Sequence, residues 1–374
     1  MRVLKILVVI SILTIIAFIS FKLGYFSNRP PDTSAVESPE YREALKFIVD
    51  NMYVHKTRYG KLVAPDGNLT SFSPYDYKNL YAAIDVLDSL KLSHALVFVE
   101  EEDQRKISRK HLKDHIEGSL ETWKNSRFSQ HVEFKDFTEY ILPYRAGNEI
   151  LSDYRKTVPR LFSKISDSLN KIKTPKEAVN IINNNLKMRL VFDLRSHADL
   201  HEPDMLSLLS QKKGSCESLT QCTSLTMRAM GLAVAIDECP VWAHRNSGHQ
   251  WNSFLDTNNK WIPFGGAEKN PDEFDAINDS VKAPKVFRHT FSVQENFGPP
   301  LENYNDIPQL FHNKTRIDVT KEYVDTLDVT IEITDNDLSP NDYLYLAVFN
   351  AEEWKIVSWA KLDKGKALFN DMGA

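Results

Sequence analysis

Two residues in the middle of the chain have the types and the surroundings that nucleophilic catalysis requires. Cys216 stands between Gly214-Ser215 and a helical pattern that runs to Met230, so its thiol is expected at the start of a helix. Unpaired backbone N–H groups and the helix dipole favour an anion there, which predicts a lowered thiol pKa and a nucleophilic thiolate. The same N–H groups could stabilise an oxyanion after the thiolate attacks a carbonyl.

His249 supplies the proton acceptor that such a thiol needs. It lies in the segment Gly248-His-Gln-Trp-Asn252, which is predicted to open a strand, and an imidazole is suited to proton transfer near neutral pH. Trp251, two residues along the same strand, is expected to pack beside the imidazole. A purely structural cysteine is the alternative interpretation of Cys216. We expect Cys222 in the same helix to be a core residue.

The elements around these residues change character along the chain. Apolar residues recur at steps of three and four from Glu40 to about Asn185, which predicts helices, including those over 77–99, 104–125 and 150–172. Thr174-Pro175-Lys-Glu177 is typical of a helix start, and a short helix is predicted over 204–209. Gly231 is expected to end the helix that Cys216 begins. From Ala233 onward, short runs rich in Val, Ile, Trp and Phe predict strands.

The tail from about Thr320 alternates between apolar and polar residues. The alternation covers 327–333, 343–349 and 354–362, and it predicts a small antiparallel β module. About four strands make half a sandwich. The module is therefore expected to be incomplete or to pack on its neighbour.

The order of cysteine at a helix start, Gly-Leu at the helix end, a strand and then Gly-His-x-Trp resembles the transglutaminase-like superfamily of papain-like thiol enzymes. The resemblance covers roughly residues 130–300 and is strongest over 213–264. Residues 137–145, Glu149 and 285–288 are similar to a bacterial envelope branch of that superfamily. The resemblance implies Cys216 as nucleophile and His249 as general base.

The fold that the resemblance implies is α+β. It consists of a helical N-terminal region, a papain/transglutaminase-like core with a helix packed on an antiparallel sheet, and then a small β-sandwich-like module. The expected divisions are 1–30 (membrane anchor or signal), 31–185 (helical region), 186–315 (core) and 316–374 (β module). A chain of 374 residues has room for two or three domains.

The third catalytic residue departs from the family pattern. The family has Trp-x-Pro-x-Asp after the histidine strand, whereas this sequence reads Trp261-Ile-Pro-Phe-Gly265. If Asn258-Asn259 forms a two-residue turn, the numbers of paired residues sum to 517 and His249 faces Glu268. We therefore expect Glu268 to orient His249.

Other possibilities for this third position stay open. A bulge at Gly265-Gly266 would shift the pairing by one or two residues. As a separate alternative, Glu268 is a solvated loop carboxylate and Asp237 or a backbone carbonyl orients the imidazole.

The first thirty residues predict a membrane anchor or a signal peptide. Arg2 and Lys5 precede a charge-free run from Ile6 to Phe21. A helix over residues 3–22 rises about 1.5 Å per residue and spans a bilayer core of about 30 Å when its flanking lysines snorkel. No small-x-small cleavage site follows, which favours an uncleaved anchor over a cleaved signal. Either way, the main part of the chain is expected on the extracytoplasmic side of the cell envelope, in the periplasm of a bacterium.

Composition excludes several classes. Acidic residues outnumber basic ones 51 to 46, so no nucleic-acid partner is expected. The three cysteines, Cys216, Cys222 and Cys239, are too few for a disulfide scaffold and contain no Cys-x-x-Cys pair for a zinc ribbon. No cofactor or metal is expected, and the grouping of His197, His201 and Glu202 is a weak alternative because Pro203 interrupts it.

The expected function is thiol-dependent acyl transfer on amide or peptide bonds, of the cysteine protease/amidase or transglutaminase type. Hydrolysis is favoured, because nothing in the sequence specifies an amine acceptor. The expected partner is a peptide, protein or glycoconjugate substrate. The alternative is a catalytically inactive scaffold that binds peptide or glycan, which the missing aspartate favours.

Overall fold

The computed structural model describes residues 38–70, 72, 77–193, 203–278, 280–301, 304–333 and 342–373. The predicted anchor over 3–22 and the grouping of His197, His201 and Glu202 lie outside the described residues. Among the helices that are described, none has the length and hydropathy that crossing a bilayer requires. Two compact units make up the chain, residues 1–42 and residues 43–374, and every element after the first helix belongs to the second.

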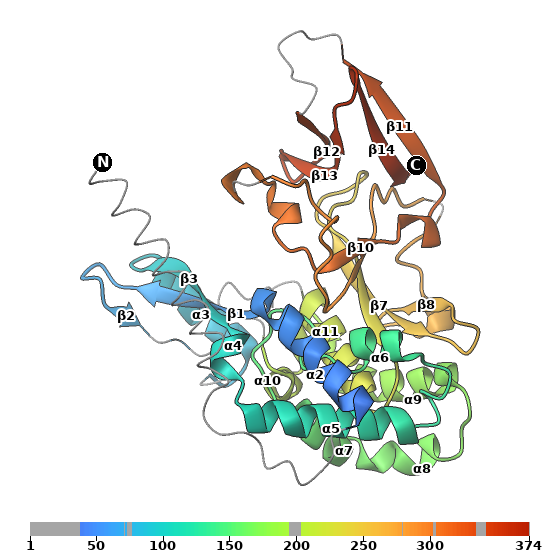
Figure 1. The fold of residues 1–374 in the computed structure, drawn as a ribbon. Coiled ribbons are helices and arrows are strands. Elements are labelled where there is room, and N and C mark those ends of the chain that lie inside the picture. The colour runs from blue at the N-terminus through green and yellow to red at the C-terminus, as the bar shows by residue number, and fades with distance from the viewer. Residues whose placement is uncertain are drawn as a thin grey trace, which may run out of the picture. The chain divides into compact units, whose positions relative to one another are not determined.

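The described residues form helices and mostly antiparallel strands (Figure 1). The α-helices are α2 (Pro39–Asn51), α3 (Leu80–Lys91), α4 (Asp103–Lys106), α5 (Arg109–Asn125), α6 (Phe134–Tyr140), α7 (Tyr154–Leu161), α8 (Ser166–Leu169), α9 (Pro175–Lys187), α10 (Met205–Gln211) and α11 (Cys216–Ala229). The strands are β1 (Lys56–Val63), β2 (Leu69–Thr70), β3 (Ala95–Glu102), β4 (Val191–Phe192), β5 (Lys213–Gly214), β6 (Val234–Cys239), β7 (His249–Leu255), β8 (Trp261–Phe264), β9 (Phe287–His289), β10 (Arg316–Asp318), β11 (Thr326–Glu332), β12 (Tyr343–Asn350), β13 (Glu353–Lys361) and β14 (Lys366–Gly373). Short 3₁₀ helices add η1 (Met52–Val54), η3 (Ser163–Ile165), η5 (Pro271–Glu273), η6 (Tyr304–Asp306), η7 (Gln309–Phe311) and η8 (Thr320–Glu322).

The central element is a five-stranded antiparallel sheet in the order β10-β9-β6-β7-β8. Helix α11 packs on β6 and β7 and also contacts α7 and α9, and Figure 1 shows it beside β7. The buried interface joins apolar side chains of the helices to those of the strands, among them Val179, Ile182, Leu219, Leu225, Val234 and Phe254. This arrangement confirms the predicted α+β fold with a helix packed on an antiparallel sheet.

The ends of the two core helices follow from their local sequences. Thr174 and Glu177 form a capping box at the start of α9, as the Thr-Pro-Lys-Glu pattern predicts. Ser215 caps α11 by accepting a hydrogen bond from the Ser218 N–H. Gly231 follows α11 with φ of 85°, a left-handed conformation that glycine adopts without steric cost.

The predicted helical region also contains a three-stranded sheet. Strand β1 pairs with β3 along its whole length and with β2 at one end. The helix predicted over 77–99 is therefore wrong beyond Lys91, where α3 ends. Residues 97–99 read Val-Phe-Val, a run with high strand propensity, and its pairing partner lies some forty positions earlier, beyond the reach of local periodicity.

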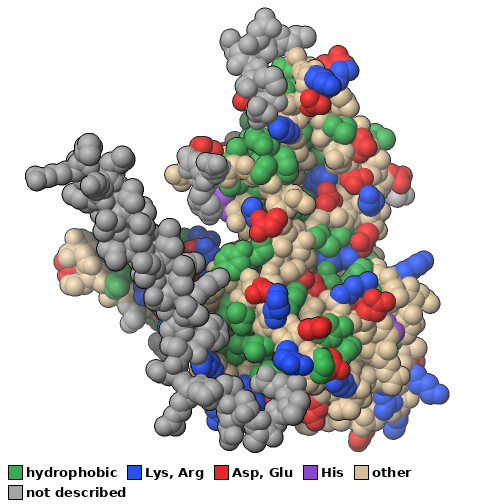
Figure 2. Space-filling view, in the orientation of Figure 1, with side chains coloured by type: hydrophobic (Ala, Val, Ile, Leu, Met, Phe, Trp, Pro, Cys, Tyr) green, Lys and Arg blue, Asp and Glu red, His purple; other side chains and the backbone are tan. Residues whose placement is uncertain are grey.

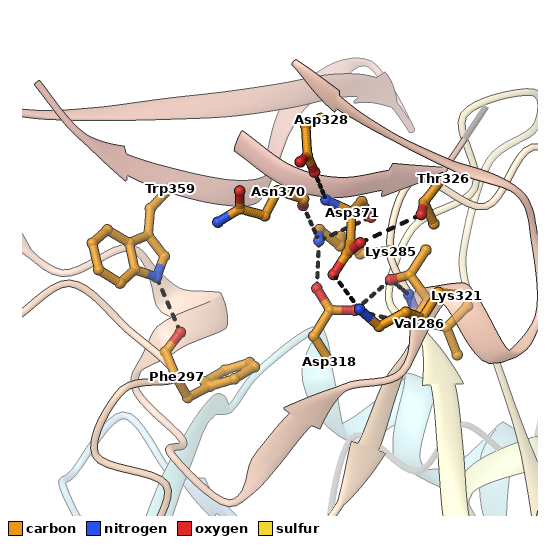
Figure 3. A network of polar contacts seen from close by, with 11 residues as sticks. Lys285, Val286, Phe297, Asp318, Lys321, Thr326, Asp328, Trp359, Asn370 and Asp371 are labelled. Carbon is orange, nitrogen blue, oxygen red and sulfur yellow. Dashed lines mark hydrogen bonds and ion pairs between the residues drawn. The ribbon is translucent and has the colours of Figure 1, made fainter. Parts of the chain in front are cut away.

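The predicted C-terminal β module is present as two two-stranded sheets, β11-β14 and β12-β13, around a core that includes Val357, Phe369 and Met372. Lys285 fastens this module to the central sheet: it pairs with Asp318 and donates to the backbone oxygens of Asn370 (2.7 Å) and Asp371 (3.1 Å) (Figure 3). The Trp359 indole N–H also donates to the backbone oxygen of Phe297, at 3.1 Å. The module is therefore anchored to the sheet and to the loop after β9 by partly buried polar contacts.

The molecular surface carries both signs of charge. On the face that Figure 2 shows, acidic and basic side chains lie interspersed, with apolar side chains between them. Such mixing is typical of a solvated protein surface.

Candidate functional site

Cys216 is the first residue of α11, as predicted, and its side chain is partly exposed. Burial raises the pKa of the thiol, and hydrogen bonds from the backbone N–H groups of Gln250 and Glu217 offset this only in part. Gln250 directly follows His249. The start of α11 and the start of β7 therefore meet at the thiol.

The predicted lowering of the Cys216 pKa by the helix start is wrong. Two carboxylates, Glu217 and Glu268, lie close enough for their charge to raise the pKa of the thiol further. Helix N–H groups favour a thiolate, but desolvation and two nearby negative charges oppose it more strongly here. The resting thiol is therefore neutral at pH 7.

His249 is the first residue of β7 and is half-buried. Burial lowers the pKa of the imidazole, and the charge of Arg245 lowers it further, so the ring is neutral at pH 7. Within the described part of the chain, neither ring nitrogen has a hydrogen-bond partner. The Trp251 ring lies 6.2 Å from the imidazole, between centroids, which confirms the predicted packing. His249 is thus a neutral base with an unengaged lone pair.

The backbone before His249 has room only for glycine. A Cβ atom on Gly248 would overlap the backbone carbonyl oxygens of Cys239 and Pro240. Cys239 is also the residue that faces His249 across the β6–β7 pair. The close approach of the two backbones therefore fixes where the histidine leaves the loop and enters the strand.

A residue of the C-terminal module holds that loop. Asn350, at the end of β12, is 2% exposed. Its side-chain amide donates to the backbone oxygens of Trp242 (2.9 Å), Arg245 (2.9 Å) and Ser247 (3.1 Å). Its amide oxygen accepts a hydrogen bond from the Ser247 N–H (2.9 Å). The neighbouring Ala351 N–H donates to the Asn246 side chain at 2.8 Å. Sequence reasoning missed Asn350, because nothing in the local pattern links it to a loop a hundred positions earlier.

The strand register that set Glu268 opposite His249 is wrong. The pairs run from Leu255↔Trp261 to Asn252↔Phe264, so the numbers sum to 516 instead of 517. The loop holds residues 257–259, with Asn259 at φ of 57°, and is one residue longer than the predicted turn. Pairing ends at Phe264, and the chain then reverses through a tight turn in which Gly265 and Lys269 exchange backbone hydrogen bonds.

Glu268 still reaches the site, by way of that turn. It is half-buried, burial raises its pKa, and its charge acts on Cys216. The buried Asn183 holds the turn through contacts to Gly265 O (3.1 Å), Lys269 O (3.0 Å) and Ala267 N–H (2.7 Å). No hydrogen bond joins Glu268 to His249 among the described residues.

Asp237, the alternative orienting residue, is fully engaged elsewhere. It is buried on β6 and accepts four hydrogen bonds, two from the Arg288 guanidinium (both 2.8 Å), one from Ser253 (2.7 Å) and one from Tyr323 (2.5 Å). These contacts use both carboxylate oxygens. Asp237 therefore holds the sheet together and does not orient His249.

The other two cysteines and two of the tryptophans are core residues. Cys222 is buried within α11, and burial raises its pKa to about 12, which agrees with its predicted place in the core. Trp242 and Trp251 are also buried. Among the three cysteines, Cys216 is partly exposed, and Cys222 and Cys239 are buried.

Comparison with known proteins finds a family model that matches the middle of the chain. Residues 163–265 match the transglutaminase-like superfamily. A solved structure of a candidate cysteine protease from Cytophaga hutchinsonii is similar to this chain at 14% identity, with a TM-score of 0.25, over 31% of this chain and 37% of that one. The matched part is therefore little more than a third of that protein's length. A comparison with curated protein sequences finds no match.

The matched segment contains both Cys216 and His249 and ends three residues before Glu268. The resemblance to the transglutaminase-like superfamily is thus confirmed over residues 163–265. The position where the family carries its aspartate is Gly265 in this chain.

Proposed function

Because residues 163–265 form a transglutaminase-like domain, we propose that this chain catalyses thiol-dependent acyl transfer on amide or peptide bonds, with water as the acceptor. One observation carries the proposal: the thiol of Cys216 lies against the backbone N–H of Gln250, the residue that follows the unengaged His249. The start of the helix that carries the candidate nucleophile and the start of the strand that carries the candidate base therefore approach each other.

In the proposed mechanism, the neutral pair reacts by general-base catalysis. His249 accepts the thiol proton while the Cys216 sulfur bonds to the carbonyl carbon, and the carbonyl oxygen becomes an oxyanion. The N–H groups of Glu217 and Gln250 are the nearest backbone donors for that oxyanion. The imidazolium then gives its proton to the leaving nitrogen, the C–N bond breaks, and an acyl-thioester remains on Cys216.

Water completes the cycle. His249 takes a proton from water as the water oxygen attacks the thioester carbonyl, and the C–S bond breaks to release a carboxylic acid and the free thiol. We assign to Glu268 the role of stabilising the transient imidazolium through its negative charge, since the turn carries that carboxylate to the site. The expected substrate is a peptide, protein or glycoconjugate outside the cytoplasm, with the chain anchored in the membrane through residues 3–22.

A non-catalytic scaffold is the second candidate. Gly265 at the family's aspartate position and the raised pKa of Cys216 both favour it. A scaffold would bind peptide or glycan near Cys216 and His249 without forming a covalent intermediate.

Mass spectrometry of the full chain in detergent, incubated with a mixture of peptides, separates the two candidates. The enzyme proposal predicts hydroxylamine-sensitive acyl adducts on Cys216 and cleaved peptides, both absent from Cys216→Ser. Adducts should persist longer in Glu268→Gln, because hydrolysis of the thioester also passes through the imidazolium. Peptide binding without any adduct or cleavage product would overturn the enzyme proposal and favour the scaffold.

A further inference from the structure

A cavity of about 80 Å³ lies beside the candidate nucleophile. Its lining includes Glu217 and Gln250, the residues that follow Cys216 and His249, and also Gln221 one turn along α11. A cavity of this size is several times larger than a single water molecule requires. It can therefore hold a small chemical group of a ligand that reacts at Cys216.

Most charged groups around the cavity already have partners. The pairs are Arg145 with Asp103 (2.7 Å), Arg316 with Glu238 (2.7 Å) and His289 with Glu238 (3.1 Å), while Arg228 donates to Val234 O and Arg145 O, and Glu139 accepts from Ser292. Burial raises the pKa of Glu238, but the charges of Arg316 and His289 bring it down to about 2. The ion pairs with Glu238 are therefore strong, and they hold Arg316 and His289 in place. These side chains line the cavity in fixed positions and are not available to bind a ligand.

Two side chains of α11 have polar atoms whose hydrogen-bonding capacity is not used. The Glu217 carboxylate has one hydrogen bond among the described residues, a long one of 3.4 Å from the Gln221 amide nitrogen. The Gln221 side chain is 3% exposed, and its amide oxygen has no hydrogen-bond partner. This corner of the cavity therefore presents acceptor oxygens and is short of donors, a state that a buried polar site does not keep without a ligand or water.

The charges around the cavity also favour a ligand that donates hydrogen bonds and carries a positive charge. Burial raises the pKa of Glu217, and the charge of Glu238 raises it further, so ionised Glu217 is poorly compensated. The other carboxylates at the cavity are held by cations or by backbone N–H groups, as Glu238 is by Arg316 and Glu149 by Ala146 and Gly147. Glu217 has no ion-pair partner among the described residues, and a single cation would supply one.

We propose that this corner is a subsite for a primary ammonium group, carried by the substrate close to the carbonyl that Cys216 attacks; the substrate part of this statement rests on the proposed function. An ammonium group donates three hydrogen bonds and carries one charge, which matches the Glu217 carboxylate and the Gln221 amide oxygen. A quaternary ammonium has the charge but no donor. The subsite therefore selects amine-bearing substrates, whether the amine is a side chain or a free amino terminus.

Thiol-modifying reagents test the subsite without any need for turnover. Three alkyl methanethiosulfonates of similar length are compared on the full chain: neutral ethyl, aminoethyl and trimethylammonium-ethyl. In each reaction the Cys216 thiolate attacks the reagent's thioalkyl sulfur, a mixed disulfide forms, and methanesulfinate leaves. Rates are measured by mass spectrometry with peptide mapping, and each is divided by the rate on the urea-unfolded chain.

The aminoethyl reagent is expected to react about tenfold faster than the ethyl reagent, a preference of about 1.4 kcal/mol. The trimethylammonium reagent should show little of this preference. Glu217→Gln should abolish it and Gln221→Met should reduce it, whereas Asp272→Asn, an exposed carboxylate with the same loss of charge, should retain it. A thermal melt of each variant confirms folding, and the two substitutions in α11 test the subsite independently.

Equal ratios for the aminoethyl and trimethylammonium reagents would overturn the subsite, since charge alone would then explain the rate. A normalised aminoethyl rate no higher than the ethyl rate would also overturn it and leave a cavity filled with water. Neither result bears on acyl transfer, which is read from adducts and cleaved peptides. Conversely, a preference lost in Glu217→Gln together with no peptide cleavage would leave the ammonium site standing and remove the enzyme proposal.

Discussion

The two halves of the candidate site are positioned in different ways. The cysteine half is local: Ser215 caps the helix, Gly231 follows its end, and the apolar face of α11 places the first residue against the sheet. The histidine half depends on distant contacts, because Asn350 of the C-terminal module holds the loop that leads into His249.

The C-terminal module therefore contributes to the site, because one of its residues positions the loop before His249. One buried side chain, which donates three hydrogen bonds and accepts one, fixes a loop that is otherwise exposed over residues 243–247. Lys285 in turn fixes the module to the central sheet (Figure 3). Loosening the module should therefore disturb the base and leave the nucleophile in place.

The largest effect is expected from Gly248→Ala. The added methyl group overlaps two backbone oxygens, so the strand must shift and carry His249 with it. A displacement of about 1 Å costs about 100-fold in rate for a catalytic group, and we expect that loss in peptide cleavage and in alkylation of Cys216 at pH 7. Gly118→Ala in α5 is the matched control, because no atom lies near its added Cβ. Equal activity of the two variants would show that the approach at Gly248 is not needed.

Asn350→Ala is expected to have the next largest effect. It leaves buried backbone groups without partners, which should lower the free energy of unfolding by about 2–3 kcal/mol and slow His249-dependent alkylation of Cys216 about tenfold. Asn370→Ala, at an exposed asparagine of the same module, is the control. The pH profile of alkylation separates the two roles of Asn350. If Asn350 positions His249, the part of the profile that follows the ionisation of His249 changes; if it only stabilises the fold, that part does not. If that part of the profile is unchanged in Asn350→Ala, the residue has a structural role only.

Glu268→Gln should produce two smaller effects of opposite kind. Removing a negative charge near Cys216 lowers the pKa of the thiol toward its ordinary value, because Glu268 contributes to raising it. Turnover should nevertheless fall several-fold, since the imidazolium loses a stabilising charge. Titration of the thiolate by its ultraviolet absorbance and steady-state kinetics measure the two quantities. A lowered thiol pKa with unchanged turnover would remove Glu268 from the mechanism.

Ser215→Ala should have the smallest effect on the reaction. The substitution removes the cap of α11 and should lower the free energy of unfolding by about 1 kcal/mol in urea titrations. The packed face of the helix still holds its first turn, so the alkylation rate of Cys216 should change less than twofold. A tenfold loss would show that the cysteine half is not fixed by its helix as we infer.

The same difference explains how much the sequence could predict. The capped helix starts at Thr174 and Ser215 and the glycine at 231 were predictable because each depends on neighbouring residues. The β7–β8 register was mispredicted by one residue because the loop has three residues, with Asn259 alone in the left-handed conformation, in place of a two-residue turn. The pairing of β1 with β3 and the reach of Asn350 were not predictable, since both join segments that lie far apart in the chain.

The chemistry of the site followed the same rule. Residue types and order were enough to select Cys216 and His249 as candidates. The pKa of Cys216 could not be predicted, because burial and the charges of Glu217 and Glu268 depend on the folded structure. The directions of the two pKa shifts indicate that the Cys216 thiol and the His249 imidazole are both neutral at pH 7.

The most direct test of the account is the alkylation rate of Cys216 by iodoacetamide from pH 4 to 10, in the full chain and in His249→Ala. Because burial lowers the pKa of His249, the rate should rise to a plateau through an apparent pKa below 6.5, and it should rise again above pH 9 as the thiol itself ionises. On the plateau the unmodified chain should react at least about tenfold faster than His249→Ala, which keeps only the alkaline rise. Identical profiles with a single alkaline rise would show that His249 does not act on Cys216 and would contradict the account.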